Sequence, residues 1–154
     1  MKIAIVGTAP SSRMLAPFDN TDWKIWGCSP GIAPDFSTFC DLPRLDAWFE
    51  LHRFDEPALA EKLNADGLEA YRVWMTKLAA DGVKVVTQEQ IDGGELYPLE
   101  AITAEFGRYF TNTISFMIAY AIQAGATDIM LAGVDMAAVD EYGAQRPSCE
   151  YHLG

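Results

Sequence analysis

Residues 2–12 read KIAIVGTAPSS, and this stretch decides the fold class. Its first five residues form an apolar, largely β-branched run that stops at Gly7, which is typical of a strand buried on both faces of a parallel sheet. The small and polar residues that follow predict a turn. Either Ser11 or Ser12 is placed to cap a short helix that continues to Leu15, because a serine oxygen accepts from the free amides of a first helical turn.

The same alternation of strand and helix continues along the chain. We expect further strands at residues 23–28, 45–51, 83–86 and 127–132, and helices at residues 57–81, 98–106 and 113–124. Apolar residues at spacings of three and four predict the first of these helices, and Gly82 is placed to end it. The helix over 113–124 is apolar on almost every side, so we expect it to be buried. Proline, glycine and polar residues predict loops over 29–44 and 87–98.

This pattern predicts a Rossmann-like α/β fold with a mostly parallel sheet of five or more strands and helices on both faces. No internal repeat or linker divides the sequence, so we expect one domain over residues 1–154. A last helix is expected to begin at Glu150. Sheets of this kind often carry one more helix and strand, so we expect either a C-terminal truncation or an edge covered by a partner, as in a homodimer.

The composition limits the classes of ligand. The 154 residues include 22 acidic and 11 basic side chains, which give a net charge of -11. Residues 78–154 carry most of the surplus, with 11 acids against three bases. Because phosphate contacts come from lysine and arginine, this balance argues against nucleic acid or an anionic membrane surface as a partner. A small anionic ligand is still compatible with the sequence.

The sequence also lacks the signals of export and of membrane insertion. Three cysteines with no C-x-x-C pair suggest neither a disulfide framework nor a zinc site. No signal-peptide pattern precedes the first strand, and no apolar run reaches the roughly 18 residues of a membrane helix. We therefore expect a cytoplasmic protein.

Ligands of open parallel sheets bind beyond the carboxyl ends of the strands. We expect three segments that are remote in sequence, 7–12, 111–115 and 133–136, to converge there on one concave surface. In the first, the candidate ligand-binding residues are Gly7, Thr8, Pro10, Ser11 and Ser12, with free backbone amides at the helix start facing a phosphate. The alternative is a plain turn with a serine cap.

The second segment, residues 111–115, places four polar side chains just before the apolar helix. One helix cap needs only one of them. We therefore favour ligand contacts from Thr111, Thr113 and Ser115 over capping alone.

The third segment ends a strand with Asp135, followed by Tyr142 and Arg146. A carboxylate at this place accepts from a ribose or sugar hydroxyl, ligates a divalent ion or caps a turn. No D-x-D triplet is present, so Mg²⁺ is the less favoured interpretation. Arg146 is the best phosphate partner in this half of the chain. His52 follows the third strand, where it is either the general base of a reaction or a structural histidine.

Three stretches together resemble the bacterial sialyltransferase-like proteins and the related domain of motility-associated glycosyltransferases. They are KIAIVGTAPS at residues 2–11, FTNTIS at 110–115 and GATDIMLAGVDM at 125–136. The chain also resembles small Rossmann-like proteins encoded by tailed phages, with which it shares AWFELH at residues 47–52 and DEY at 140–142.

The resemblance implies a Rossmann-like domain that holds a cytidine-monophosphate sugar. It implies nucleotide contacts from the opening loop, from Ser29 after the second strand and from the Thr/Ser motif, and a phosphate contact from Tyr142. The sequence departs from the active transferases at Thr8 and Ser29, where they carry asparagine. It also ends before the region of their catalytic histidine, so His52 is the one well-placed base for a transfer.

Our leading hypothesis is a protein that binds a nucleotide or nucleotide-sugar of the CMP type, with glycosyl transfer as the reaction if it is an enzyme. The first alternative is a non-enzymatic phage protein that sequesters a signalling nucleotide of the host. The second is an interaction protein whose acidic half meets a basic partner.

Overall fold

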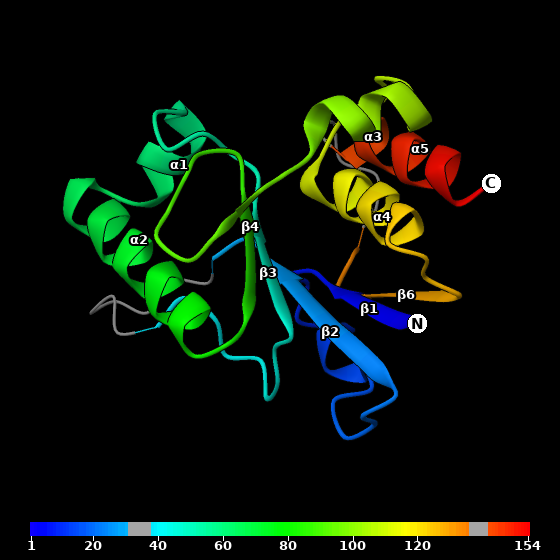
Figure 1. Ribbon diagram of the computed structural model, residues 1–154, viewed down its shortest axis with the longest axis horizontal. Helices are drawn as coiled ribbons and strands as arrows, with labels where there is room; N and C mark the ends of the chain where they lie inside the picture. The colour runs from blue at the N-terminus through cyan, green and yellow to red at the C-terminus, as the bar shows by residue number, and fades with distance from the viewer. Residues whose placement is uncertain (31–37, 136–141) are drawn as a thin grey trace. The chain divides into compact units, whose positions relative to one another are not determined.

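The computed structural model describes residues 1–30, 38–135 and 142–154. Its six strands have the order β5-β4-β3-β2-β1-β6, and every pairing of strands within its two units is parallel (Figure 1). The α/β fold with a parallel sheet of at least five strands is therefore confirmed. Residue contacts divide the chain into two compact units, Met1–Cys28 with Pro98–Gly154, and Ser29–Tyr97.

The first unit is built around β1 (Lys2–Val6), which lies between β2 (Trp23–Cys28) and β6 (Asp128–Ala132). Four of the five β1 residues are buried, as the continuous apolar run predicts. Helix α4 (Thr113–Gln123) packs on β1 and is almost wholly apolar. Helices α3 (Leu99–Phe106) and α5 (Tyr142–Leu153) pack against α4 in turn (Figure 1).

The second unit contains β3 (Ala47–Glu50), β4 (Lys84–Thr87) and β5 (Glu95–Leu96). Helix α2 (Ala65–Ala80) packs on β4, and the short helix α1 (Pro57–Lys62) packs on α2. The core of this unit gathers apolar and aromatic side chains from both layers: Phe39, Trp48, Phe54, Leu59, Leu63, Tyr71, Met75, Val85 and Ile91.

Four expectations about the elements are wrong. The helix over 57–81 is two helices, because the Asn64 side chain accepts from the amide of Gly67 and starts α2 anew. The loop over 87–98 contains β5, whose two residues are too few for a period to show. The helix expected from Glu150 begins at Tyr142 and holds Pro147 in its interior, where proline normally ends a helix. The helix near Leu15 is a single 3-10 turn, Arg13–Leu15, without a side-chain cap.

None of the helices in the described ranges is both long and apolar enough to cross a membrane.

Candidate functional site

The ends of β1 and β6 meet backbone to backbone. The amide of Gly7 donates to the carbonyl of Ala132 at 2.8 Å, and the amide of Ala9 donates to the carbonyl of Gly133 at 2.9 Å. A Cβ atom at Gly7 would lie 2.4 Å from the Gly133 oxygen, so only glycine fits there. Gly133 adopts a positive φ of 68°. Gly7 therefore admits the neighbouring loop rather than a ligand.

The serines of the first loop bind the aspartate of the β6 loop. The Ser11 hydroxyl donates to one carboxylate oxygen of Asp135, and the Ser12 hydroxyl donates to the other at 3.2 Å. Ser12 also accepts from the amide of Gly133 at 3.2 Å. Segments 7–12 and 133–135 therefore lie together, although their first residues are 126 positions apart in the sequence. Residue 136 lies outside the described residues.

The sequence predicted free backbone amides facing a phosphate at this helix start, and the amides of Ser12 and Arg13 do not fit that prediction. The element after the loop has only three residues, and the amides of Ser12 and Arg13 both donate to the carbonyl of Ala9. A single turn whose amides are already bonded offers little to an anion. Thr8 and Pro10 are exposed at the tip of the loop.

An open pocket of about 440 Å³ lies between the end of β6 and α5. Its lining is part apolar and part charged: Leu131, Val134, Asp135, Arg146, Cys149, Glu150 and Leu153. Arg146 Nε contacts a Glu150 carboxylate oxygen at 2.7 Å on the exposed face of α5. This volume falls within the range of small-molecule sites in proteins. The Tyr142 side chain lies outside the described part of the structure.

The segment 111–115 contacts α5, but none of its residues is part of the pocket lining given above. Asn112 caps α4, since its side-chain oxygen accepts from the Ser115 amide at 2.8 Å. The same oxygen lies 3.6 Å from the sulfur of Cys149, which lines the pocket. The Thr111 hydroxyl lies 2.6 Å from that of Ser148, and the buried Ser115 hydroxyl donates to the Asn112 carbonyl. Two of the four polar side chains, Thr111 and Asn112, therefore link this segment to α5, whereas Ser115 bonds at the start of its own helix and Thr113 is half-buried in the first turn.

A second polar cluster lies in the other unit, just after β3. The Glu50 carboxylate is 1% exposed, and its Oε1 atom lies 2.7 Å from Nδ1 of His52. The same oxygen accepts from the His52 amide at 2.9 Å. The His52 side chain is 39% exposed, so one edge of the imidazole faces buried carboxylate and the rest reaches solvent.

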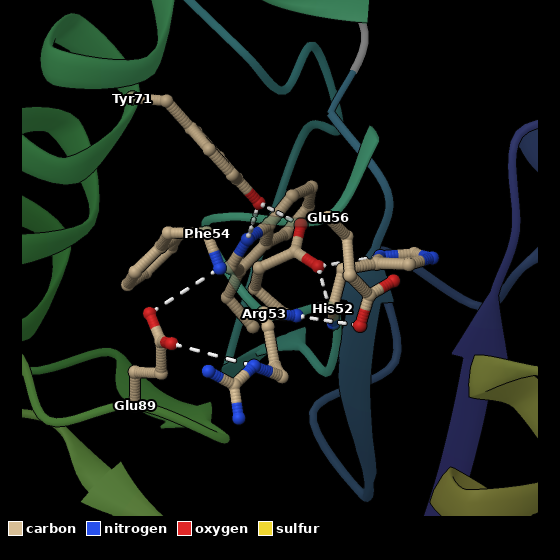
Figure 2. A network of polar contacts seen from close by, with 8 residues as sticks. His52, Arg53, Phe54, Glu56, Tyr71 and Glu89 are labelled. Atoms are coloured by element: carbon tan, nitrogen blue, oxygen red, sulfur yellow. Dashed lines mark hydrogen bonds and ion pairs between the residues drawn. The ribbon is translucent and has the colours of Figure 1, made fainter. Parts of the chain in front are cut away.

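Two aromatic side chains hold the carboxylate from behind. The Tyr71 hydroxyl, which projects from α2 into the cluster (Figure 2), donates to Oε2 of Glu50 at 2.9 Å. Trp48 Nε1 donates to the Tyr71 oxygen at 2.8 Å. Both side chains are fully buried. A series of hydrogen bonds therefore runs from Trp48 in the core through Tyr71 and Glu50 to the half-exposed imidazole of His52.

The hydrogen bond to Glu50 raises the pKa of His52 above its ordinary value. Burial opposes this shift, while the negative charges of Glu50 and Glu56 add to it and the positive charge of Lys62 subtracts from it. The net effect is that the imidazolium form of His52 persists to higher pH than in a free histidine.

The loop that carries His52 is braced by further carboxylates (Figure 2). Glu56 accepts from the Arg53 amide at 2.9 Å, and Glu89 accepts from the Phe54 amide at 3.2 Å. The Arg53 guanidinium binds Asp55 with two nitrogens. These bonds fix the backbone on the C-terminal side of His52.

Several functional features could not be read from residue type alone. Glu50 is the one signal that the sequence offers, because a carboxylate inside the apolar run AWFEL must find donors in the core. Tyr71 sits on an apolar helical stripe, which hides its polar role. Ser29 follows β2 in a left-handed conformation with a φ of 61°, which is uncommon for serine.

Comparisons with protein-family models, with curated proteins and with solved structures find no match. The resemblance to sialyltransferase-like proteins therefore stays a prediction. Within the described residues, no three His, Cys, Asp or Glu side chains are grouped so as to hold a metal ion.

Proposed function

We propose that this protein binds a nucleotide or a nucleotide-sugar in the pocket between β6 and α5. One observation carries the proposal: the pocket opens at the carboxyl ends of parallel strands and is lined by both Asp135 and Arg146. Ligands of open parallel sheets bind at this edge.

The lining offers a partner for each chemical part of such a ligand. Asp135 is exposed and already accepts from two hydroxyl groups, so ribose or sugar hydroxyls are suitable replacements. Arg146 supplies a positive charge for phosphate. Its ion pair with Glu150 is exposed on both sides, and exposed pairs contribute little to stability, so Arg146 can exchange this partner for a phosphate. Leu131, Val134 and Leu153 supply apolar contact for a base or for the face of a sugar.

The overall charge favours a small ligand over a polymer. With a net charge of -11, the protein repels an extended polyanion. A mononucleotide meets mainly the local field of the pocket, because charges beyond a Debye length of about 8–10 Å are screened.

A thermal-shift and calorimetry series with CMP, UMP, ADP-ribose and their sugar conjugates tests the proposal. A ligand at a hundred times its Kd should stabilise the protein by about 2.7 kcal/mol. Asp135→Asn should weaken binding about tenfold, because a hydrogen bond to a charged acceptor contributes about 1.5 kcal/mol.

Asp128→Asn is the matched control. Asp128 is an exposed aspartate at the other end of the same strand, and it also accepts from a hydroxyl, that of Thr127. Binding should be unchanged in this variant. An equal loss in both variants, or no binding of any of these compounds at millimolar concentration, would contradict the proposal.

A further inference from the structure

We propose that the Ser11 hydroxyl competes with a ribose hydroxyl of the nucleotide for one carboxylate oxygen of Asp135, and that Ser12 positions this carboxylate. The protein then selects ribonucleotides, and Ser11 limits its affinity for them. The inference rests on the proposed function, because it assigns one group of that ligand. All three residues belong to one compact unit, Met1–Cys28 with Pro98–Gly154.

The Asp135 carboxylate belongs both to the pocket and to the junction of two loops. It is exposed and is part of the pocket lining. Its Oδ2 atom accepts from the Ser11 hydroxyl, and its Oδ1 atom accepts from the Ser12 hydroxyl at 3.2 Å. The serines are not in the lining, so a ligand in the pocket meets them only through this shared carboxylate.

The two serines are held to different degrees. The Ser12 hydroxyl also accepts from the amide of Gly133 at 3.2 Å, and the Ser12 carbonyl accepts from the Leu15 amide at 3.0 Å. Because Gly133 is buried, loss of the hydroxyl at its amide is costly. The Ser11 side chain is exposed, and among the described residues its hydroxyl has Asp135 as its one partner. Ser12 is therefore fixed, whereas Ser11 can release its oxygen.

A ribose hydroxyl is the same kind of donor as the serine hydroxyl. Both are alcohols that donate one proton to a carboxylate oxygen, so replacing one with the other keeps the number of hydrogen bonds constant. A bond between two exposed groups is also exchanged easily, because water replaces either partner. Only molecules in which Ser11 has released Oδ2 of Asp135 are competent to bind the ribose, so the contact lowers the apparent affinity for the ligand.

Dependence on this carboxylate also determines which nucleotides fit. A deoxyribose that lacks the bonding hydroxyl cannot replace Ser11 at Asp135. Sites that form a hydrogen bond with a substrate hydroxyl discriminate strongly against analogues without it. The phosphate is expected at Arg146, since Asp135 repels it. We therefore expect a deoxyribonucleotide to bind about tenfold more weakly than its ribonucleotide.

The first experiment measures urea denaturation of the wild type, Ser11→Ala and Ser12→Ala. The two substitutions remove the same group from neighbouring residues. We expect Ser12→Ala to lower the midpoint of unfolding and Ser11→Ala to leave it close to that of the wild type. Equal losses of stability in the two variants would show that Ser11 is a structural residue. That result would overturn the proposal, whether or not any nucleotide binds.

The second experiment is calorimetry of the same three proteins with CMP and UMP, each compared with its 2′-deoxy and 3′-deoxy counterparts. Ser11→Ala should bind the ribonucleotide about three- to tenfold more tightly than the wild type, because the competing hydroxyl is gone. Ser12→Ala should bind it more weakly. The deoxy compound that lacks the bonding hydroxyl should gain no affinity in Ser11→Ala.

Thr127→Ala is the matched control. Thr127 is exposed and donates to an exposed aspartate, Asp128, at the opposite end of β6. Affinity for the ribonucleotides should be the same in this variant as in the wild type.

The outcomes separate this inference from the proposed function. A ribonucleotide affinity that Ser11→Ala leaves unchanged or lowers would overturn the competition, because a ligand that binds beside Ser11 gains nothing from its removal. Equal affinity for a ribonucleotide and both of its deoxy counterparts would overturn the assignment of the hydroxyl. Absence of binding of any nucleotide to either the wild type or Ser11→Ala would instead contradict the proposed function, and the denaturation experiment would still test the difference between the two serines.

Discussion

At the scale of single residues, the junction of the β1 and β6 loops depends on the absence of a side chain at Gly7. We predict that Gly7→Ala lowers the free energy of unfolding by about 2–3 kcal/mol, because the new Cβ would overlap the backbone oxygen of Gly133. Urea denaturation measures this loss.

Gly125→Ala is the comparison for that prediction. Gly125 has a φ of 79°, and an added Cβ would meet nothing within 4 Å, so only the backbone conformation is penalised, by about 1 kcal/mol. A smaller loss for Gly7→Ala than for Gly125→Ala would contradict the close contact of the two loops.

The pair of Glu50 and His52 makes stability depend on pH. The hydrogen bond to Glu50 raises the pKa of His52 in the folded protein above its unfolded value of about 6.5. The stabilisation is therefore complete below that value and is lost as pH rises through the folded pKa. We predict that the stability advantage of the wild type over His52→Asn shrinks as the pH rises from about 6 through the folded pKa of His52.

Urea denaturation of both proteins at three pH values in this range gives the difference directly. The stability advantage of the wild type over Glu50→Gln should shrink with rising pH in the same way. A difference that stays constant with pH would contradict the charged pair.

The sequence predicted the type of several site residues but not their partners. Hydroxyls and a carboxylate were expected at the sheet edge, and Ser11, Ser12 and Asp135 are there, bonded to one another. A hydroxyl accepts or donates to whatever is near, so its partner depends on the tertiary fold. The capping role of Asn112 was weighed for its segment, whereas the link from that segment to α5 involves residues 37 positions away.

At the scale of elements, α5 forms one wall of the pocket and is anchored near its end by His152. The imidazole is 7% exposed, stacks on Phe110 at a centroid distance of 4.4 Å, and donates from Nε2 to the Tyr109 carbonyl at 3.0 Å. We predict that His152→Ala costs about 2 kcal/mol of stability, since it removes both the packing and the hydrogen bond. Nucleotide affinity should fall too, because the wall is no longer held.

Hydrogen exchange across α5 and urea denaturation test this anchor. Tyr151→Phe is the control, because Tyr151 is 61% exposed and the substitution keeps its edge contact with His152. Unchanged exchange in α5 of the His152→Ala protein would contradict the anchoring role.

Elements with strong local signals were predictable, and those defined by tertiary contacts were not. The buried strand β1, the partly buried strand β6 and the apolar helix α4 lie within a residue or two of the predicted ranges, because continuous apolar runs are diagnostic at these lengths. β5 has two exposed residues and exists only through its pairing with β4. The break before α2 depends on one asparagine side chain, which a periodic pattern cannot register.

At the scale of the whole molecule, the sheet order follows from a few general rules. β1 lies between β2 and β6, so the first strand is an inner strand and β6, the last strand of the described chain, lies at an edge. Parallel strands joined by right-handed crossovers produce such an order, and the carboxyl ends then share one side. The expectation that segments 7–12, 111–115 and 133–136 converge was derived in this way from the sequence, and the bonds observed join 7–12 to 133–135. The chemical identity of a ligand does not follow from topology.

The most direct test of the central claim is a titration of the ¹⁵N-labelled protein with CMP, followed by the amide signals of assigned residues. The account predicts saturable shifts at Gly133, Asp135 and Cys149, with little change at Glu95 and Leu96 in β5. No shifts at millimolar CMP, or saturable shifts confined to residues away from β6 and α5, would contradict it.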